Sequence, residues 1–253
     1  MSGLILECAV RTDVGPVRSQ NEDAVFATSR LVAVADGVGG HAAGEVASQA
    51  VIDVLAHLEK CWLSEPLPAA LARAVHSGNE RIGFIAECRP EMAGMSTTLT
   101  AVALHEDYVI ANIGDSRTYL YRDGVLTQLT RDDSYLQMLI DRDAVDAESA
   151  RTHPRRNLVL EALDGGPDRA PVVMTHPARV GDRLLLCSDG LSDALEAETI
   201  RETLRTPSRD RCAERLLALS LDAGARDNVS VIVADVAATD QPPSTWLPRT
   251  RNS

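Results

Sequence analysis

Four acidic residues stand where hydrophobic segments of this chain begin or end. Asp36 follows the run LVAVA, Asp115 follows VIANIG, Asp189 follows RLLLCS, and Asp227 comes just before VSVIVADV. A single Asp at a strand end is most often a turn former. Turn chemistry gives no reason, however, for carboxylates at so many of the most hydrophobic segments. Oxygen ligands are what hard cations such as Mg²⁺ and Mn²⁺ prefer, so the pattern favours a site for divalent cations.

A second polar set lies near the N-terminus, where Arg18, Asn21, Glu22 and Asp23 follow a Gly-Pro turn. A guanidinium group can bind two oxygens of one phosphate, and two carboxylates beside it could hold metal-bound water. The same residues would suit an ordinary solvated loop. Taken alone, this segment does not separate the two interpretations.

The elements that must position these residues can be predicted in outline. Residues 31–35 have the length and composition of a strand buried on both faces, which puts Asp36 at a strand end. The Gly-rich residues 37–44 then lead into a helix. Gly37 would let the backbone approach a cation closely, so its carbonyl is a candidate ligand. His41 is the only histidine near this turn, and it is either a surface residue at the helix start or a proton donor or substrate contact.

The remaining pattern indicates an antiparallel sheet and several amphipathic helices. Segments 95–105 and 108–115 are separated by two residues, and an Asp-Gly turn at 123–124 marks another hairpin. Helices are expected over about 67–87, 192–195, 198–204 and 211–221. Residues 131–157 form a polar insertion that is a candidate substrate-facing flap or a connecting helical hairpin. We expect one domain over 1–238 and a mobile, Pro-rich tail over 239–253.

Composition excludes several classes of protein. The chain has 253 residues, is 45% hydrophobic and has a net charge of −12 without a basic cluster, which argues against nucleic acid as a partner. It has no apolar run near the roughly 20 residues of a membrane span and no signal-peptide pattern. We therefore expect a soluble, cytoplasmic protein without membrane insertion, and we also expect a monomer. Five cysteines without CxxC spacing fit reduced thiols.

Taken in order, the motifs resemble those of the type 2C metal-dependent Ser/Thr protein phosphatases, in particular the bacterial branch. The motifs are RSQNED at 18–23, VADGVGG at 34–40, GMSTT at 94–98, NIGDSR at 112–117, SDG at 188–190 and DN at 227–228. Each is weak alone, but this many in one order are specific. The resemblance implies an α+β fold, a four-layer αββα sandwich of two antiparallel β-sheets packed face to face with helices on both outer faces.

The resemblance also implies a set of metal ligands. Asp36 would bridge two Mn²⁺ or Mg²⁺ ions, with Asp189 and Asp227 completing the first site and the Gly37 carbonyl helping to hold the second. Asp115, together with Asp189, would bind a weaker third ion. Two such cations lower the pKa of a bridging water and stabilise the oxygens of an in-line displacement.

The remaining implied roles concern the substrate. Glu22, Asp23 and Asn228 would act largely through metal-bound water, and Arg18 would bind the substrate phosphate. The implied reaction is hydrolysis of phosphoserine and phosphothreonine monoesters in proteins. The implied partners are phosphorylated proteins, including a cognate bacterial Ser/Thr kinase.

One position departs from the family pattern, because some members have a histidine directly after the Asp-Gly pair and this chain has Val38. The role of general acid is therefore not transferred to His41, and a metal-bound water is an alternative proton donor. Three other classes of protein fit the sequence less well. A silent regulator with this fold would lack ligands that are present here, a calcium-binding module would concentrate its carboxylates in one loop, and an acidic interaction protein would need no ligands.

Overall fold

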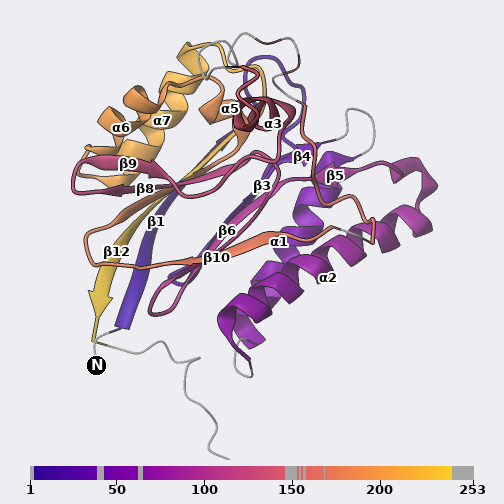
Figure 1. Ribbon diagram of the computed structural model, residues 1–253, viewed down its shortest axis with the longest axis horizontal. Helices are drawn as coiled ribbons and strands as arrows, with labels where there is room; N and C mark the ends of the chain where they lie inside the picture. Colours follow the sequence, from indigo (N-terminus) through magenta and orange to yellow (C-terminus); the bar gives the residue numbers. More distant parts are fainter. Residues whose placement is uncertain are drawn as a thin grey trace, which may run out of the picture.

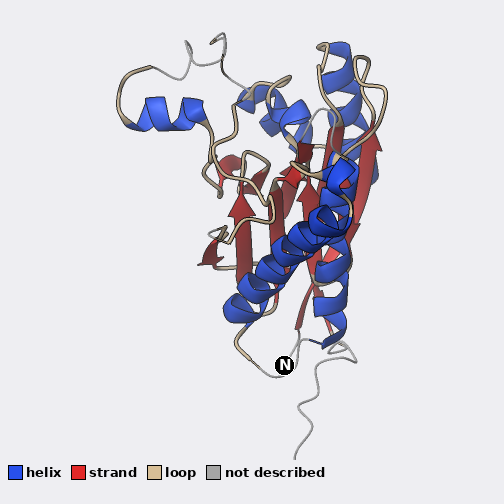
Figure 2. Ribbon diagram, turned by 90° about the vertical axis from the view of Figure 1, so that its right-hand side faces the viewer, coloured by secondary structure: helices blue, strands red, loops and turns tan. Residues whose placement is uncertain are grey.

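Two five-stranded antiparallel sheets lie face to face, and helices cover both outer faces (Figures 1 and 2). The computed structural model describes residues 3–38, 43–61, 65–145, 153, 155, 158–167 and 169–240. The arrangement confirms the predicted four-layer sandwich.

The first sheet joins the two ends of the described chain. Its strands, in spatial order, are β1 (Gly3–Asp13), β12 (Val229–Thr239), β11 (Arg183–Cys187), β8 (Arg117–Arg122) and β9 (Val125–Gln128). The longest pairing is between β1 and β12, which match residue for residue along their whole lengths. As a result, the segments that flank Asp13 and Asn228 lie side by side.

The second sheet contains the strand that leads to Asp36. Its order is β10 (Val172–His176), β7 (Tyr108–Ile113), β6 (Leu99–Leu104), β3 (Leu31–Ala35) and β2 (Ala24–Ala27). A separate two-stranded ladder pairs β4 (Gly37–Val38) with β5 (Ser96–Thr97). The predicted hairpins are confirmed as β6–β7 and β8–β9.

The helices form two outer layers. The second sheet is covered by α1 (Gly44–Cys61) and α2 (Leu67–Cys88), and a short 3₁₀ turn, η1 (Pro90–Met92), follows α2. The first sheet is covered by α5 (Asp189–Ser192), α6 (Ala197–Leu204) and α7 (Arg209–Asp222). The helix α3 (Tyr135–Asp141) lies within the predicted insertion and has no fully buried residue, so the apolar face expected there is only partly covered.

Burial on both faces explains the unbroken apolar strands. In β3, Leu31, Ala33 and Ala35 pack toward the helices, whereas Val32 and Val34 pack between the sheets. A strand with helices on one face and a sheet on the other has no solvent face, so polar alternation disappears. The apolar runs of β11 and β12 have the same cause.

Two sequence predictions need correction. The expected strand over 95–105 is interrupted at Thr98, because Thr97 belongs to the small β4–β5 ladder and β6 starts at Leu99. The short helix expected at 192–195 begins earlier, at Asp189, because Ser188 ends β11 and the helix follows at once. The other long helices lie within a few residues of their predicted bounds.

Three further expectations concern the chain as a whole. No helix among the described residues is long and apolar enough to cross a membrane. The four cysteines whose side chains are described are unpaired, and Cys187 and Cys212 are buried. The predicted tail begins where β12 ends at Thr239, and residues 241–253 lie outside the described part of the chain.

Candidate metal centre

Strand direction brings the predicted carboxylates to one edge of the sandwich. β3 and β7 are both antiparallel to β6, so they run the same way and lead to Asp36 and Asp115 at the same edge. In the other sheet, β11 ends before Asp189 and its antiparallel partner β12 starts after Asp227. Strand direction therefore gathers one pair of carboxylates in each sheet, and the electrostatic repulsion of Asp36 by Asp189 and Asp227 shows that the two pairs lie close together.

The gathered carboxylates affect one another electrostatically. Burial, and then repulsion from neighbours that include Asp23 and Asp189, raises the pKa of Asp36 well above its ordinary value. Burial and the carboxylates of Asp115 and Asp227 do the same for the pKa of Asp189. Burial is also the main cause that raises the pKa of Asp23 to about 6 and that of Asp115 to about 7. A nearby cation would relieve this repulsion.

Two buried oxygens in the cluster lack a protein partner. Oδ1 of Asp189 and Oδ1 of Asp23 accept no hydrogen bond from any described residue. Buried polar atoms are normally satisfied, so these two oxygens suit a polar partner from outside the chain, such as a cation. An all-oxygen donor set suits Mn²⁺ or Mg²⁺.

The cluster is nevertheless not a preformed coordination sphere. Among the described residues, no three His, Cys, Asp or Glu side chains stand in the arrangement of a metal site. One reason is that Asp227 is engaged by Arg18, whose guanidinium donates a 2.6 Å hydrogen bond to Oδ2 of Asp227. The burial and orphaned oxygens fit divalent cations, whereas the individual ligand assignments stay predictions.

The loop that carries Glu22 and Asp23 is held by Asn228. Its Oδ1 accepts a hydrogen bond from the Glu22 amide, and its Nδ2 donates to the carbonyls of Val14 and Gln20. Because Asn228 uses both ends of its amide on the backbone, the structure gives it a positioning role beside its predicted contact with metal-bound water. The Asp23 carboxylate of the same loop is held by Ser188, whose hydroxyl donates a 2.8 Å hydrogen bond to Oδ2 of Asp23.

Gly37 lies where three backbone segments meet. A Cβ at this position would lie 2.4 Å from the Gly44 carbonyl oxygen and 2.6 Å from the Glu22 carbonyl oxygen. The Gly37 amide donates to that Glu22 carbonyl. Only glycine fits this close approach, which agrees with the backbone freedom expected from the sequence. His41 lies outside the described residues.

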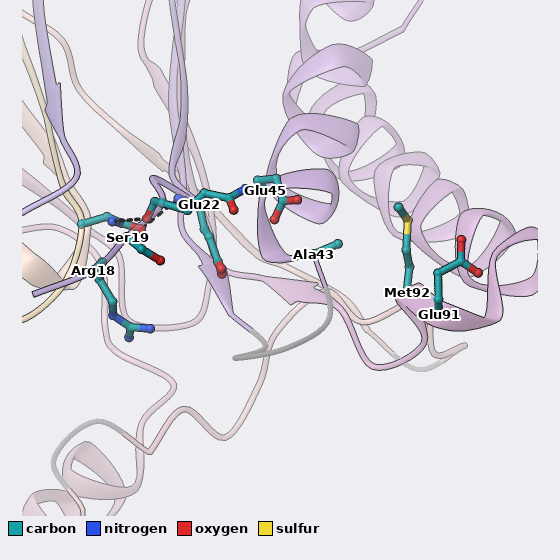
Figure 3. Close-up of a pocket in the computed structure, with 9 residues that line it drawn as sticks. Arg18, Ser19, Glu22, Ala43, Glu45, Glu91 and Met92 are labelled. Carbon is teal, nitrogen blue, oxygen red and sulfur yellow. Dashed lines mark hydrogen bonds between the residues drawn. The ribbon is translucent and has the colours of Figure 1, made fainter.

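A cavity of about 490 Å³ opens beside the cluster. Figure 3 shows Arg18 and Glu22 on one side of this cavity and Glu91 and Met92 on the other, with Glu45 between them. Asn228 also contributes to the lining. Of the predicted residues, Arg18, Glu22 and Asn228 thus line the cavity, whereas Asp36 and Asp115 are buried and do not contribute to its lining.

Sequence reasoning missed several residues that support the cluster. Thr97 and Thr98 hold the backbone of Asp36: Thr97 Oγ1 and the Thr98 amide each donate to its carbonyl at 2.9 Å. Both belong to the GMSTT motif, which is visible in the sequence although no role was assigned to its residues. Ser188 could have been noticed because it precedes a predicted ligand.

The fold and the carboxylate edge together define a class of αββα sandwich proteins with a candidate site for divalent cations at one sheet edge. The family model described as Protein phosphatase 2C matches residues 18–222. The chain belongs to this family, as the sequence motifs predicted.

Named relatives agree with this membership. The chain is 49% identical over 238 residues to the serine/threonine protein phosphatase PstP of Mycobacterium tuberculosis, covering 94% of this chain and 46% of that protein. It is 36% identical to the serine/threonine phosphatase stp of Listeria monocytogenes, covering 89% and 94% respectively. The chain thus spans about half the length of the mycobacterial relative and most of the Listeria one.

A solved structure gives the same fold. The catalytic domain of PstP in complex with two manganese ions superimposes with a TM-score of 0.87 at 48% identity, covering 92% of this chain and 99% of that one. The two manganese ions belong to that protein. They agree with the cofactor class predicted here from the carboxylates.

Proposed function

We propose that this chain is a metal-dependent Ser/Thr protein phosphatase that hydrolyses phosphoserine and phosphothreonine monoesters. The observation that carries the proposal is the buried carboxylate cluster with two unpartnered oxygens, next to a cavity that contains a guanidinium group. The named relatives, which are serine/threonine phosphatases, support it.

In this proposal, Asp36 is the central ligand because its repulsive contacts reach the carboxylates on both sheets. Asp189 and Asp227 complete the set from the first sheet, the Gly37 carbonyl contributes from β4, and Asp115 serves an additional ion. Divalent cations held there would supply an activated water and neutralise charge on the phosphoryl oxygens. Glu22 and Asp23 orient water from the loop that Asn228 holds.

Arg18 binds the phosphate of the substrate. Its hydrogen bond to Asp227, followed by other nearby carboxylates, raises the pKa of the guanidinium, so it stays charged at every working pH. Its side chain is half exposed and lines the cavity. A phosphate that enters there can replace Asp227 as the acceptor of the Arg18 hydrogen bond, which leaves the Asp227 carboxylate free for a cation. Binding of phosphate and of metal would then support each other.

The substrates and partners belong to the same proposal. The phosphorylated proteins would include a cognate Ser/Thr kinase, and the enzyme would act as a cytoplasmic monomer. The phosphoprotein relationship is supported by the serine/threonine phosphatase names of the relatives, whereas the kinase, the location and the monomeric state rest on the sequence alone.

Hydrolysis of p-nitrophenyl phosphate and of a phosphothreonine peptide tests the function. Activity should be lost in EDTA and restored by Mn²⁺. Asp36→Asn should abolish turnover, whereas Arg18→Ala should mainly raise KM. Asp107→Asn, an exposed residue in the β6–β7 turn at the opposite edge, is the matched control and should behave as wild type. A folded protein that binds Mn²⁺ without turnover would instead be a silent regulator.

A further inference from the structure

A small polar ladder connects the two sheets near the metal edge. Thr98 Oγ1 and Ser116 Oγ lie 2.7 Å apart, and Thr100 Oγ1 and Thr118 Oγ1 also lie 2.7 Å apart. All four residues are fully buried. Thr98 and Thr100 belong to the second sheet or its edge, whereas Thr118 lies in β8 of the first sheet and Ser116 directly precedes β8. We call these four residues the hydroxyl ladder.

The two rungs differ in what they touch. Thr98 Oγ1 accepts a hydrogen bond from the Asp36 amide at 3.3 Å, and the Thr98 amide donates to the Asp36 carbonyl at 2.9 Å. Its partner Ser116 directly follows Asp115. The second rung continues instead from the Thr118 amide to Oγ1 of Thr130. The first rung therefore links the backbone of Asp36 to the residue that follows Asp115. The second rung links residues of the core that are not candidate ligands.

Apolar side chains fill much of the layer between the sheets, and Val32, Val34 and Ile232 are among them. Valine would fill the same volume without a polar group. A buried hydroxyl that loses its hydrogen-bond partner destabilises the folded state, so each rung opposes sliding of one sheet over the other. The ladder therefore fixes the spacing between the sheets where the carboxylates are.

We propose that Thr98 and Ser116 are positioning residues that set the separation of Asp36 and Asp115 for cation binding. The hydrogen bonds to both peptide groups of Asp36 fix its backbone, and the contact across the layer fixes that backbone relative to the β7–β8 turn. This inference rests on the metal assignment in the proposed function.

The second rung supplies a matched control. Thr98→Val and Thr100→Val each remove one buried hydroxyl, so both should lower the melting temperature, Thr98→Val by more because the Asp36 amide also loses its acceptor. Only Thr98→Val should weaken Mn²⁺ binding, measured by isothermal titration calorimetry with the metal alone. Loss of a residue that supports a metal ligand typically costs about 10–100-fold in affinity. Thr98→Ser keeps the hydroxyl and should restore binding.

Ser116→Ala removes the partner hydroxyl of the same rung on the other sheet. Because alanine is smaller than serine, this variant adds no steric crowding, so it can replace Thr98→Val if that variant does not fold. It should weaken Mn²⁺ binding more than Thr100→Val does. Equal Mn²⁺ affinity in the Thr98, Ser116 and Thr100 variants would overturn the proposal, as would a wild-type protein that binds no Mn²⁺. Wild-type Mn²⁺ binding without phosphatase activity would refute the proposed function alone, because the calorimetric comparison needs no turnover.

Discussion

Gly190→Ala should disable the metal edge through one added methyl group. Gly190 lies in the first turn of α5, directly after Asp189, and its Cα faces the backbone of Asn228. An alanine Cβ would lie 2.1 Å from the Asn228 carbonyl oxygen. That distance is far inside van der Waals contact, and backbone cannot rotate away as a flexible side chain can.

The size of the effect follows from what must move. The Asn228 backbone has to retreat by about 1 Å, and overpacking of this kind typically costs about 1–3 kcal/mol. The melting temperature of a domain of this size falls by about 2–4 °C per kcal/mol. Asn228 holds the Glu22 loop and follows Asp227. Its displacement would therefore also shift Glu22 and Asp227. A misplacement of about 1 Å can lower a rate by about 100-fold.

The assay compares Mn²⁺-dependent hydrolysis of p-nitrophenyl phosphate with thermal unfolding. Gly190→Ala should lose far more activity than its modest loss of stability explains. The control is Gly3→Ala, whose added Cβ meets only a methyl group of Thr239 at an ordinary 3.5 Å. If Gly190→Ala kept the wild-type rate and Mn²⁺ requirement, the close packing of α5 on Asn228 would have no part in forming the site.

Two other predictions concern stability and substrate choice. Burial alone would raise the pKa of Asp182, but hydrogen bonds from Arg122 and Tyr108 outweigh it and hold the pKa below its ordinary value. This stabilisation is complete above the unfolded-state pKa of about 4 and is lost as the pH falls through the lower folded-state pKa. Asp182→Asn should therefore lower the free energy of unfolding by about 3–5 kcal/mol at pH 7. In urea titrations, the difference in this free energy between the variant and wild type should become smaller in acid. A difference that does not change with pH would contradict the argument. Glu91→Gln should raise KM about two- to fivefold for phosphopeptides with a nearby Lys or Arg, because three glutamates and one arginine line the cavity. The KM for p-nitrophenyl phosphate should not change. An equal change in KM for both substrates would show that Glu91 does not act through the charge of the peptide.

The sequence was informative wherever a physical constraint acts locally. Strands such as β3 and β11 could be predicted because burial on both faces leaves continuous apolar runs. Asp36 and Asp189 could be selected because they end those runs. The hairpins followed from short connections, and hairpins require antiparallel sheets.

Long-range pairings could not be predicted in the same way. Arg18 and Asp227 are 209 positions apart, and Ser188 and Asp23 are 165 apart, so no local pattern records either contact. Thr98 and Thr100 look like ordinary strand residues because threonine favours strands for its shape. Thr98 pairs with Ser116, and Thr100 pairs with Thr118. These contacts depend on how the two sheets are stacked, which no local sequence pattern records.

The central claim is that carboxylates from both sheets hold divalent cations together, and crystals grown with Mn²⁺ test it most directly. Anomalous scattering from manganese should give at least two peaks at the shared sheet edge, with Asp36 in contact with both and with Asp189 and Asp227 beside them. Manganese located elsewhere, or an empty edge in crystals soaked at saturating Mn²⁺, would contradict the account.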